Sequence, residues 1–359
     1  MSKKRKAFTL IEIMAAASIM TVVFVVVLGL ASKVLTTWNR TSGEVRANFQ
    51  ANVLMRMLQD DLESAIMKKD GGAWFEVVYT DTVGQLTGTN PDATVPMIPP
   101  DIMFFASPVA RPRYTKDQYS ANAYERKPIP GSVCAMRYKL ALKSPFLQSS
   151  ANQSDNIRQY NAFYGMYRAV IDSQATFDDV LGPDVQGSDE NSAEDALANF
   201  WFTQNCNLLD EDGQRKSAVL KTWTLSPENF LAQNVVDFRV GFTVMYYDED
   251  KRAAGQEPKS YAEIAPGTKF TVAEKILVDS PLRRKNARGS YTYDVMPEQV
   301  ENGSIVYADV SITVLTDQGA KEMKARMERN MLSSDQFREI VVQNSVTVVR
   351  RITFMSERL

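Results

Sequence analysis

The stretch FTLIEIMAAASIMTVVFVVVLGLA, residues 8 to 31, decides how this chain is organised, and it contains one charged residue, Glu12. A helix of about 20 apolar residues is long enough to cross the ~30 Å hydrocarbon core of a bilayer. We therefore predict a transmembrane helix here. The basic run KKRK at residues 3 to 6 precedes it, and basic residues favour the cytoplasmic side. We expect a single-pass inner-membrane protein with its amino terminus in the cytoplasm and its carboxyl-terminal domain in the periplasm.

The residues around Ala7 indicate how the leader is processed. An ordinary secretory signal has its small residue after the apolar run, whereas Ala7 lies before it. A basic leader, a small residue and then FTLIE resemble the type IV prepilin signal of pilins and of the pseudopilins of type II secretion. The resemblance implies that a prepilin peptidase cuts between Ala7 and Phe8 and methylates the new amine of Phe8. Ala7 departs from the glycine that is usual before the cut, and Glu12 stands where the family carries a glutamate.

Glu12 also stands out on physical grounds. A carboxylate inside a bilayer costs ~2.5 kcal/mol or more and usually has a partner. The next cation along the helix is Lys33, which is too distant to pair with Glu12 within one helix. We expect an intermolecular partner for filament assembly, namely the methylated amine of Phe8 on a neighbouring subunit. The alternative is that Glu12 lies near the membrane face and reaches the headgroups.

Composition excludes several classes of function. The chain has 41 basic and 43 acidic residues and no histidine. This balance gives no support for contact with nucleic acid, and the lack of histidine excludes histidine-based triads, metal ligands and general bases. We predict no enzyme activity, no cofactor and no metal site. Cys134 and Cys206 would reach an oxidising compartment, where they form a disulfide or remain two buried thiols.

The helical pattern continues beyond the membrane to about Lys68. Apolar residues recur there at three- and four-residue spacings, at Val34, Trp38, Val45, Phe49, Val53 and Met57. We expect four parts: a prepilin leader at 1–7, a transmembrane and filament-core helix at 8–32, a periplasmic half of the helix at 33–70, and a globular pseudopilin-like domain at 71–359.

The globular domain shows the pattern of strands separated by long polar segments. Apolar and polar residues alternate over 236–246 and 306–314, and a final strand is expected at 346–354. Earlier strands are expected at 74–79, 102–106, 133–142 and 165–172. One-sided alternation is typical of antiparallel sheets with one face on the core, here on the helix. The predicted fold is α+β and pilin-like, with a long amino-terminal helix packed on antiparallel β-sheet and long loop insertions.

Several insertions interrupt the strands. Between 315 and 345 we expect helices, whose methionines at 323, 327 and 331 favour core packing over a promiscuous binding surface. Surface loops are expected at Thr80–Asp101, Gln148–Asn156, Gly182–Ala196 and Asp248–Gly303. The acidic runs 210–212 and 248–250 favour solvated turns over calcium binding, because neither has the alternating ligand spacing of a calcium loop.

Segments of the body are similar to the large minor pseudopilins of J type. These are LQDDLESA at 58–65, YGMYR at 164–168, NVVDF at 234–238, and the pair 308–315 and 346–354. The segments FFASP at 104–108, NFW at 199–201 and TVVRR at 347–351 also resemble the prepilin-like Verru_Chthon cassette protein C family.

These resemblances imply a structural minor pilin or pseudopilin that joins other subunits in a type IV pilus-like or type II secretion-like filament or its tip. Secretion, adhesion, motility and DNA uptake all stay open. The alternative is a single-pass membrane-anchored periplasmic protein whose long loops recognise a ligand.

Overall fold

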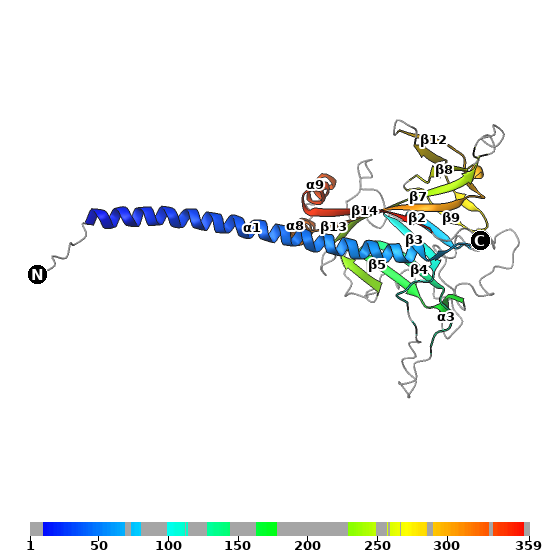
Figure 1. Cartoon of the computed structure of the whole chain (residues 1–359), viewed down its shortest axis with the longest axis horizontal. Coiled ribbons are helices and arrows are strands. Elements are labelled where there is room, and N and C mark those ends of the chain that lie inside the picture. Colours follow the sequence, from blue (N-terminus) through cyan, green and yellow to red (C-terminus); the bar gives the residue numbers. More distant parts are fainter. Residues whose placement is uncertain are drawn as a thin grey trace, which may run out of the picture. The chain divides into compact units, whose positions relative to one another are not determined.

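The computed structural model describes residues 10–68, 73–79, 99–111, 113, 128–143, 163–177, 229–248, 257, 259–265, 267–285, 290–329 and 333–354. The chain divides into two compact units, Met1–Arg46 and Ala47–Leu359. The first unit carries the beginning of helix α1, Leu10–Glu63, and the second carries the end of that helix and all the described strands. Figure 1 labels α1 and the strands of the second unit.

Helix α1 contributes one face to the core of the second unit. Its buried residues there are Ala47, Ala51, Leu54, Met55, Leu58, Asp61 and Leu62. The sequence predicted that Phe49 and Val53 belong to the apolar face of this helix that packs on the domain. This prediction is wrong, because the two residues are 71% and 45% exposed. The buried face is the neighbouring one, where alanines at 47 and 51 leave room for sheet residues against the helix. The helix also ends before Lys68, because Ser64 donates to the Asp61 carbonyl oxygen and the chain then enters a strand.

The first sheet has eight strands in the order β10-β9-β2-β3-β4-β5-β6, with β1 also paired to β3. Their bounds are β1 Ala65–Ile66, β2 Phe75–Tyr79, β3 Pro100–Ala106, β4 Cys134–Lys143, β5 Phe163–Ile171, β6 Phe230–Gln233, β9 Phe270–Val272 and β10 Ile276–Val278. The four strands expected at 74–79, 102–106, 133–142 and 165–172 are therefore confirmed as β2 to β5.

The second sheet has six strands in the order β12-β11-β8-β7-β13-β14. Their bounds are β7 Val235–Tyr247, β8 Lys259–Glu263, β11 Leu282–Lys285, β12 Tyr291–Val295, β13 Ser304–Leu315 and β14 Ser345–Thr353. All pairings between described strands are antiparallel. The α+β fold with a long amino-terminal helix and antiparallel sheets is thus confirmed.

One core joins the helix and both sheets. Phe75 of β2 packs its ring 5.5 Å from Phe104 of the same sheet and 5.5 Å from Phe242 of the other sheet. Strand β7 follows the predicted alternation, but β13 does not follow it throughout. The register of β13 against β7 shifts between Ile305 and Tyr307, so Ile305 is buried and Val306 is only half-buried. A bulge places two residues opposite one and reverses the faces beyond it.

The expected loop Asp248–Gly303 is wrong over most of its length. It contains β8, β9, β10, β11, β12 and the short helix α7, Pro297–Val300. These strands have three to five residues, too few for a pattern of period two to be distinguished from chance. Pro100 and Asp101, expected in a loop, lie in β3. The expected loops 80–98, 148–156 and 182–196 and the acidic run 210–212 lie outside the described residues.

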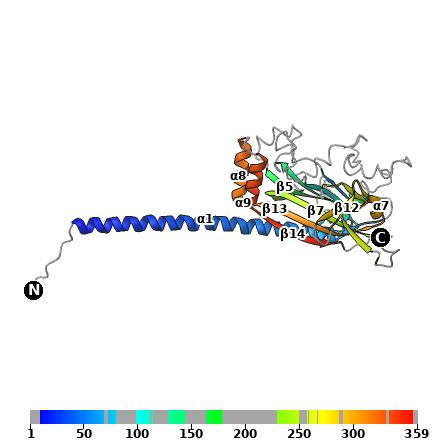
Figure 2. The same ribbon diagram turned by 90° about the horizontal axis from the view of Figure 1, so that it is seen from above.

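The helices expected between 315 and 345 are confirmed as α8, Asp317–Glu328, and α9, Ser334–Asn344. Thr316 and Ser333 cap them, each accepting a hydrogen bond from a backbone N–H of the first turn. Met323 is buried with Phe337 and Ile340 in a small second core, so core packing is the confirmed role of this methionine, whereas Met331 lies outside the described residues. Figure 2 shows α8 and α9 side by side next to β13.

Candidate functional site: the amino-terminal helix and its attachment to the sheets

The sequence predicted processing between Ala7 and Phe8 and a role in assembly for Glu12. Ala7 and Phe8 are outside the described residues. Glu12 lies in the first turn of α1 and is exposed. A carboxylate in the first turn is favourable because the amino-terminal end of a helix carries partial positive charge. Glu12 is thus stabilised in this position by the helix itself, and its assembly role remains a prediction.

The first part of α1 has the composition of a membrane span. A stretch of 18 residues in this helix is strongly apolar, and none of it is buried. Its hydroxyl groups are satisfied within the helix, because Ser18 and Thr21 donate to the carbonyl oxygens of Met14 and Ala17 at 2.9 and 2.8 Å. Internal satisfaction of polar groups is what a hydrocarbon environment requires. This helix fits a single-pass inner-membrane anchor.

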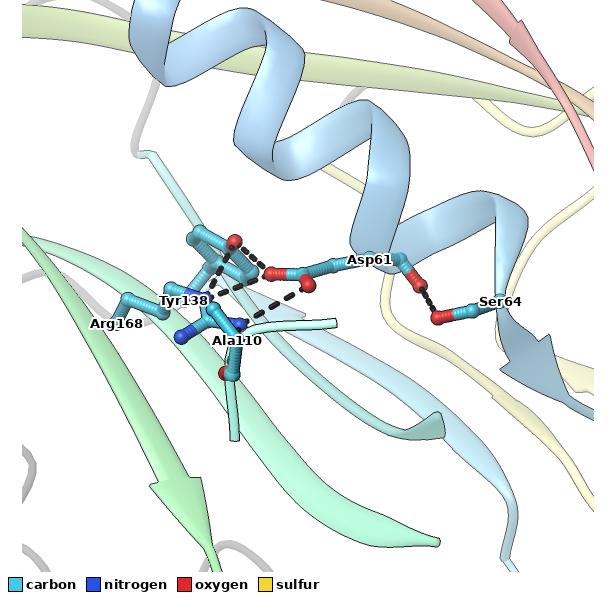
Figure 3. A network of polar contacts seen from close by, with 5 residues as sticks. All are labelled: Asp61, Ser64, Ala110, Tyr138 and Arg168. Carbon is cyan, nitrogen blue, oxygen red and sulfur yellow. Dashed lines mark hydrogen bonds and ion pairs between the residues drawn. The ribbon is translucent and has the colours of Figure 1, made fainter. Parts of the chain in front are cut away.

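The last turn of α1 is joined to the first sheet by a buried polar network (Figure 3). Asp61 accepts two hydrogen bonds from the guanidinium of Arg168 in β5, from Nε at 2.7 Å and from Nη2 at 3.0 Å. The hydroxyl of Tyr138 in β4 donates to the same carboxylate. Arg168 also donates to the carbonyl oxygen of Ala110 at 3.2 Å. The side chain of Asp61 is 3% exposed and that of Arg168 is 10% exposed, so the pair is shielded from water.

The phenol of Tyr138 remains a hydrogen-bond donor under all ordinary conditions. Burial, and secondly the charge of Asp61, raise the pKa of Tyr138 well above its usual range. The carboxylate of Asp61 therefore receives hydrogen bonds from two strands at once. A buried charge with several donors is stable, whereas removing one partner leaves an uncompensated charge.

Two further hydrogen bonds connect α1 to the strands. The Gln50 side chain donates to the carbonyl oxygen of Gln233, at the end of β6, at 2.7 Å. Arg350 of β14 donates to the side-chain oxygen of Gln59 at 2.7 Å. The helix is thus bonded to strands of both sheets.

The sequence reasoning did not select Asp61 or Arg168 as site residues, although both lie in the segments that resemble the J-type proteins. The spacing of apolar residues along the helix does indicate that Asp61 is buried. Asp61 lies three residues after Leu58 and next to Leu62, both of which are fully buried, so the carboxylate is on the apolar face of the helix. An acid in such a position needs a buried cation.

A second polar cluster lies on the other face of the first sheet. Asp101 of β3 accepts hydrogen bonds from Arg137 at 2.8 and 2.6 Å and from Lys139 at 3.0 Å. Burial alone would raise the pKa of Asp101, but the two cations outweigh it and lower that pKa. Glu76 of β2 is buried nearby, and neither of its carboxyl oxygens has a hydrogen-bond partner among the described residues. Burial raises the pKa of Glu76 to about 9.

The chemistry that these groups offer is limited. Cys134 is buried in β4, and burial raises the pKa of its thiol to about 11. It therefore stays protonated and unreactive at neutral pH. Cys206 lies outside the described residues, so the disulfide remains a prediction. Within the described part of the chain, no group of three or more acids or cysteines is placed to hold a metal ion.

Comparison with known proteins identifies the amino-terminal segment. Residues 2–28 match the family model described as the prokaryotic N-terminal methylation motif. No curated protein and no solved structure matches the chain. The motif indicates a pilin-type protein that is processed by prepilin peptidase, and it supports a structural role together with other pilin subunits.

Proposed function

We propose that this chain is a structural subunit, a minor pilin or pseudopilin of J type, that assembles into a type IV pilus-like or type II secretion-like filament or its tip. The observation that carries the proposal is that the methylation motif at residues 2–28 continues into the single 54-residue helix α1. A helix of this length can serve as a membrane anchor first and as part of a filament core later, while its last turns belong to the globular domain.

The proposed division of the chain follows from this helix. The leader, residues 1–7, is removed, residues 8–32 cross the inner membrane before assembly, and residues 33–70 continue in the periplasm. Residues 71–359 form the rest of the globular, pseudopilin-like body. The basic leader supports an amino terminus in the cytoplasm.

The exposed side chains of α1 support assembly through this helix. Trp38, Phe49 and Val53 are 71%, 71% and 45% exposed, although they lie beyond the length that a bilayer needs. Large apolar side chains exposed in line on one helix are typical of a surface that another protein covers. Helices of neighbouring subunits would cover these side chains in a filament.

Glu12 would set the position of each subunit along the filament. After cleavage, Glu12 is the fifth residue of the mature chain, and its carboxylate would pair with the methylated amine of Phe8 on a neighbour. The pair joins two charges that are both costly in an apolar filament core. Its geometry would allow only one axial offset between adjacent helices.

The test is Glu12→Ala in cells that express the other subunits. The substitution makes α1 more apolar, so membrane insertion and the globular fold should be kept. Co-purification with other subunits from cross-linked membranes should be lost, because an unpaired buried charge typically costs ~3 to 5 kcal/mol. Glu12→Gln should give an intermediate result, since it retains hydrogen bonding without charge.

Glu44→Ala is the matched control, because Glu44 lies on the same helix in an exposed pair with Arg40 and should leave co-purification unchanged. Recovery of Glu12→Ala with the other subunits at the wild-type level would contradict the pairing and would favour a membrane-anchored binding protein.

A further inference from the structure

Strand β14 lies at the edge of the second sheet. Within the described part of the chain, β13 is the only strand that pairs with it, and nine consecutive residue pairs join the two strands without a shift of register. Edge strands of natural proteins are usually short, bulged, or protected by proline or lysine, because an open edge pairs with other chains. β14 is long and regular, it contains neither proline nor lysine, and its two arginines bond to neighbouring side chains. Its edge is therefore not protected against pairing.

Two hydrogen bonds at the ends of this ladder show which backbone groups are open. The N–H of Phe354 donates to the carbonyl oxygen of Val306 at 3.0 Å, and the N–H of Thr316 donates to that of Asn344 at 2.8 Å. Both pairs continue the register of β13 and β14. In an antiparallel pair every second residue bonds to the partner strand, and the residues between turn their N–H and C=O groups the other way. The residues that turn to the open edge are Ser345, Thr347, Val349, Arg351 and Thr353.

The open edge is accessible. Among the described residues, no hydrogen bond to another element involves the outward backbone groups. Val349 is 69% exposed, and Thr347, Arg351 and Thr353 are exposed as well. N–H and C=O groups that alternate along a strand are satisfied together by an extended peptide, which adds to the sheet as a further strand. The chemistry of this edge therefore selects a peptide segment over a small molecule or a lipid.

The charge beside the edge selects among peptide segments. Arg350 donates to the neutral side chain of Gln59 at 2.7 Å, and no carboxylate pairs with it in the described part of the chain. Arg351 differs, because Asp309 accepts two hydrogen bonds from it at 2.7 and 2.8 Å. β14 contains no acidic residue. Opposite charges on neighbouring strands stabilise a sheet, and like charges destabilise it. The segment that fits best therefore carries an aspartate or glutamate beside Arg350.

A second copy of this chain does not fit the edge in the antiparallel direction. Gln50 of α1 bonds to the end of β6, where Asn234 accepts a hydrogen bond from Leu315, the partner of Ser345. Gln59, later in α1, bonds to the second half of β14. The end of α1 thus runs in the same direction as β14 (Figure 2). Two β14 strands paired antiparallel would point their α1 helices in opposite directions, whereas helices that anchor both copies in one membrane point the same way.

Parallel pairing of two β14 strands is unfavourable for a different reason. A two-fold axis along the strands keeps the direction of α1 but places identical residues side by side. Arg350 and Arg351 would then lie next to the same residues of the second copy, and like charges on neighbouring strands repel each other. The other edge strand, β12, has five residues and an irregular register against β11, so it does not match the length of β14. The occupant is therefore a different protein.

We propose that β14 binds an extended segment of a different protein by strand addition, with an aspartate or glutamate of that segment beside Arg350. The added strand bonds to the N–H and C=O groups of the outward residues and extends the six-stranded sheet by one strand. This goes beyond the proposed function, because assembly through α1 needs neither β14 nor a segment of this composition.

Hydrogen exchange of the isolated full-length chain in detergent micelles tests whether the edge is open. The N–H groups of Thr347, Val349 and Arg351 should exchange quickly, whereas those of Val348 and Arg350, which bond to β13, should be protected. Protection of the first three that rises with protein concentration would mean that a second copy covers the edge, and it would overturn the proposal.

The probe for binding is a short, end-blocked peptide of alternating valine and threonine with one glutamate at its centre. The control peptide carries lysine in place of the glutamate. The glutamate peptide should bind about tenfold more tightly, the effect of exchanging a repulsive for an attractive cross-strand pair, and it should protect the N–H groups of the outward residues from exchange. Absence of binding, equal affinities, or binding without this protection would refute the proposal.

Val349→Pro tests the edge itself. Proline removes one outward N–H and no bond to β13, and edge strands tolerate proline at such positions. The affinity for the glutamate peptide should fall about tenfold. Val349→Thr is the control, because it alters the same exposed side chain and leaves the backbone unchanged, and it should bind like wild type. An unchanged affinity of Val349→Pro would contradict strand addition.

Arg350→Gln tests the charge and does not depend on how the proline variant folds. This variant should bind the two peptides with equal affinity, because the group that distinguishes them is gone. A preference for the glutamate peptide that persists in Arg350→Gln would count against the proposal. Leader cleavage and the co-purification that depends on Glu12 do not involve β14, so they report separately on the proposed function.

Discussion

Replacing Glu76 by glutamine should stabilise the protein, and by an amount that grows with pH. Glu76 is 1% exposed and lies in β2 between Met103 of β3 and Thr271 of β9. Glutamine has nearly the same shape and also remains unpaired there. The substitution therefore removes the ability to ionise and changes little else.

The magnitude follows from the pKa. Burial is the largest influence on the pKa of Glu76, and Asp101 raises it further, while Lys269 and Arg137 lower it; the result is a rise from 4.5 to about 9. Below pH 4.5 the carboxyl group is protonated in both the folded and the unfolded chain, so it has no pH-dependent effect on stability. Between pH 4.5 and about 9 only the unfolded chain releases the proton, so the wild type loses stability as pH rises. At pH 7 this loss is about 3 kcal/mol, at about 1.4 kcal/mol per pH unit.

The assay is urea unfolding of wild type and Glu76→Gln in detergent at pH 5, 7 and 8.5, with the difference between the two proteins taken at each pH. This difference should be small at pH 5 and should favour the variant by about 3 kcal/mol at pH 7 and by more at pH 8.5. Glu298→Gln, at an exposed position of α7, controls for the loss of one negative charge. A difference that does not change from pH 5 to 8.5 would refute the reasoning.

Three further outcomes are expected. Asp61→Asn should lower the free energy of unfolding by about 3 to 5 kcal/mol, because its arginine partner becomes a buried unpaired charge, whereas Arg351→Gln, which breaks an exposed pair, should cost at most about 1 kcal/mol in the same urea titration. Ala7→Gly should speed leader cleavage and Ala7→Phe should block it, as read from the mature amino terminus by mass spectrometry; an intact wild-type leader beside an active prepilin peptidase would contradict this. Alkylation of the unreduced, denatured protein should label neither Cys134 nor Cys206 if they are bridged, and two labelled thiols would exclude the bridge.

The strands that could be predicted from the sequence are those in which apolar and polar residues alternate regularly. Strand β7 has thirteen residues, and over Val236 to Tyr246 its inward positions are all apolar. Strand β13 obeys the same rule only in its middle, because its register against β7 shifts near Val306 and again between Thr313 and Val314. A bulge depends on the partner strand, so the sequence of β13 alone does not contain it. The strands β8 to β12 were missed because each buries only a few side chains.

The candidate site was predictable only in part for a similar reason. The methylation motif is local and contiguous, so residues 2–28 disclosed it directly. The network of Asp61, Tyr138 and Arg168 joins residues as far as 107 positions apart. Such a contact depends on how the helix meets the sheet, and periodicity along either element does not specify it.

The attachment of α1 also decides how the protein carries mechanical force. If α1 is pulled, the covalent chain passes the load from Ser64 to the two-residue strand β1, which is a weak connection. The ion pair of Asp61 and Arg168 offers a parallel path into β5. That strand is bonded to β4 over nine consecutive residue pairs, so the load would be shared among many backbone hydrogen bonds. Tension on α1 would then be spread over the strands of the eight-stranded sheet and would not fall on β1 alone.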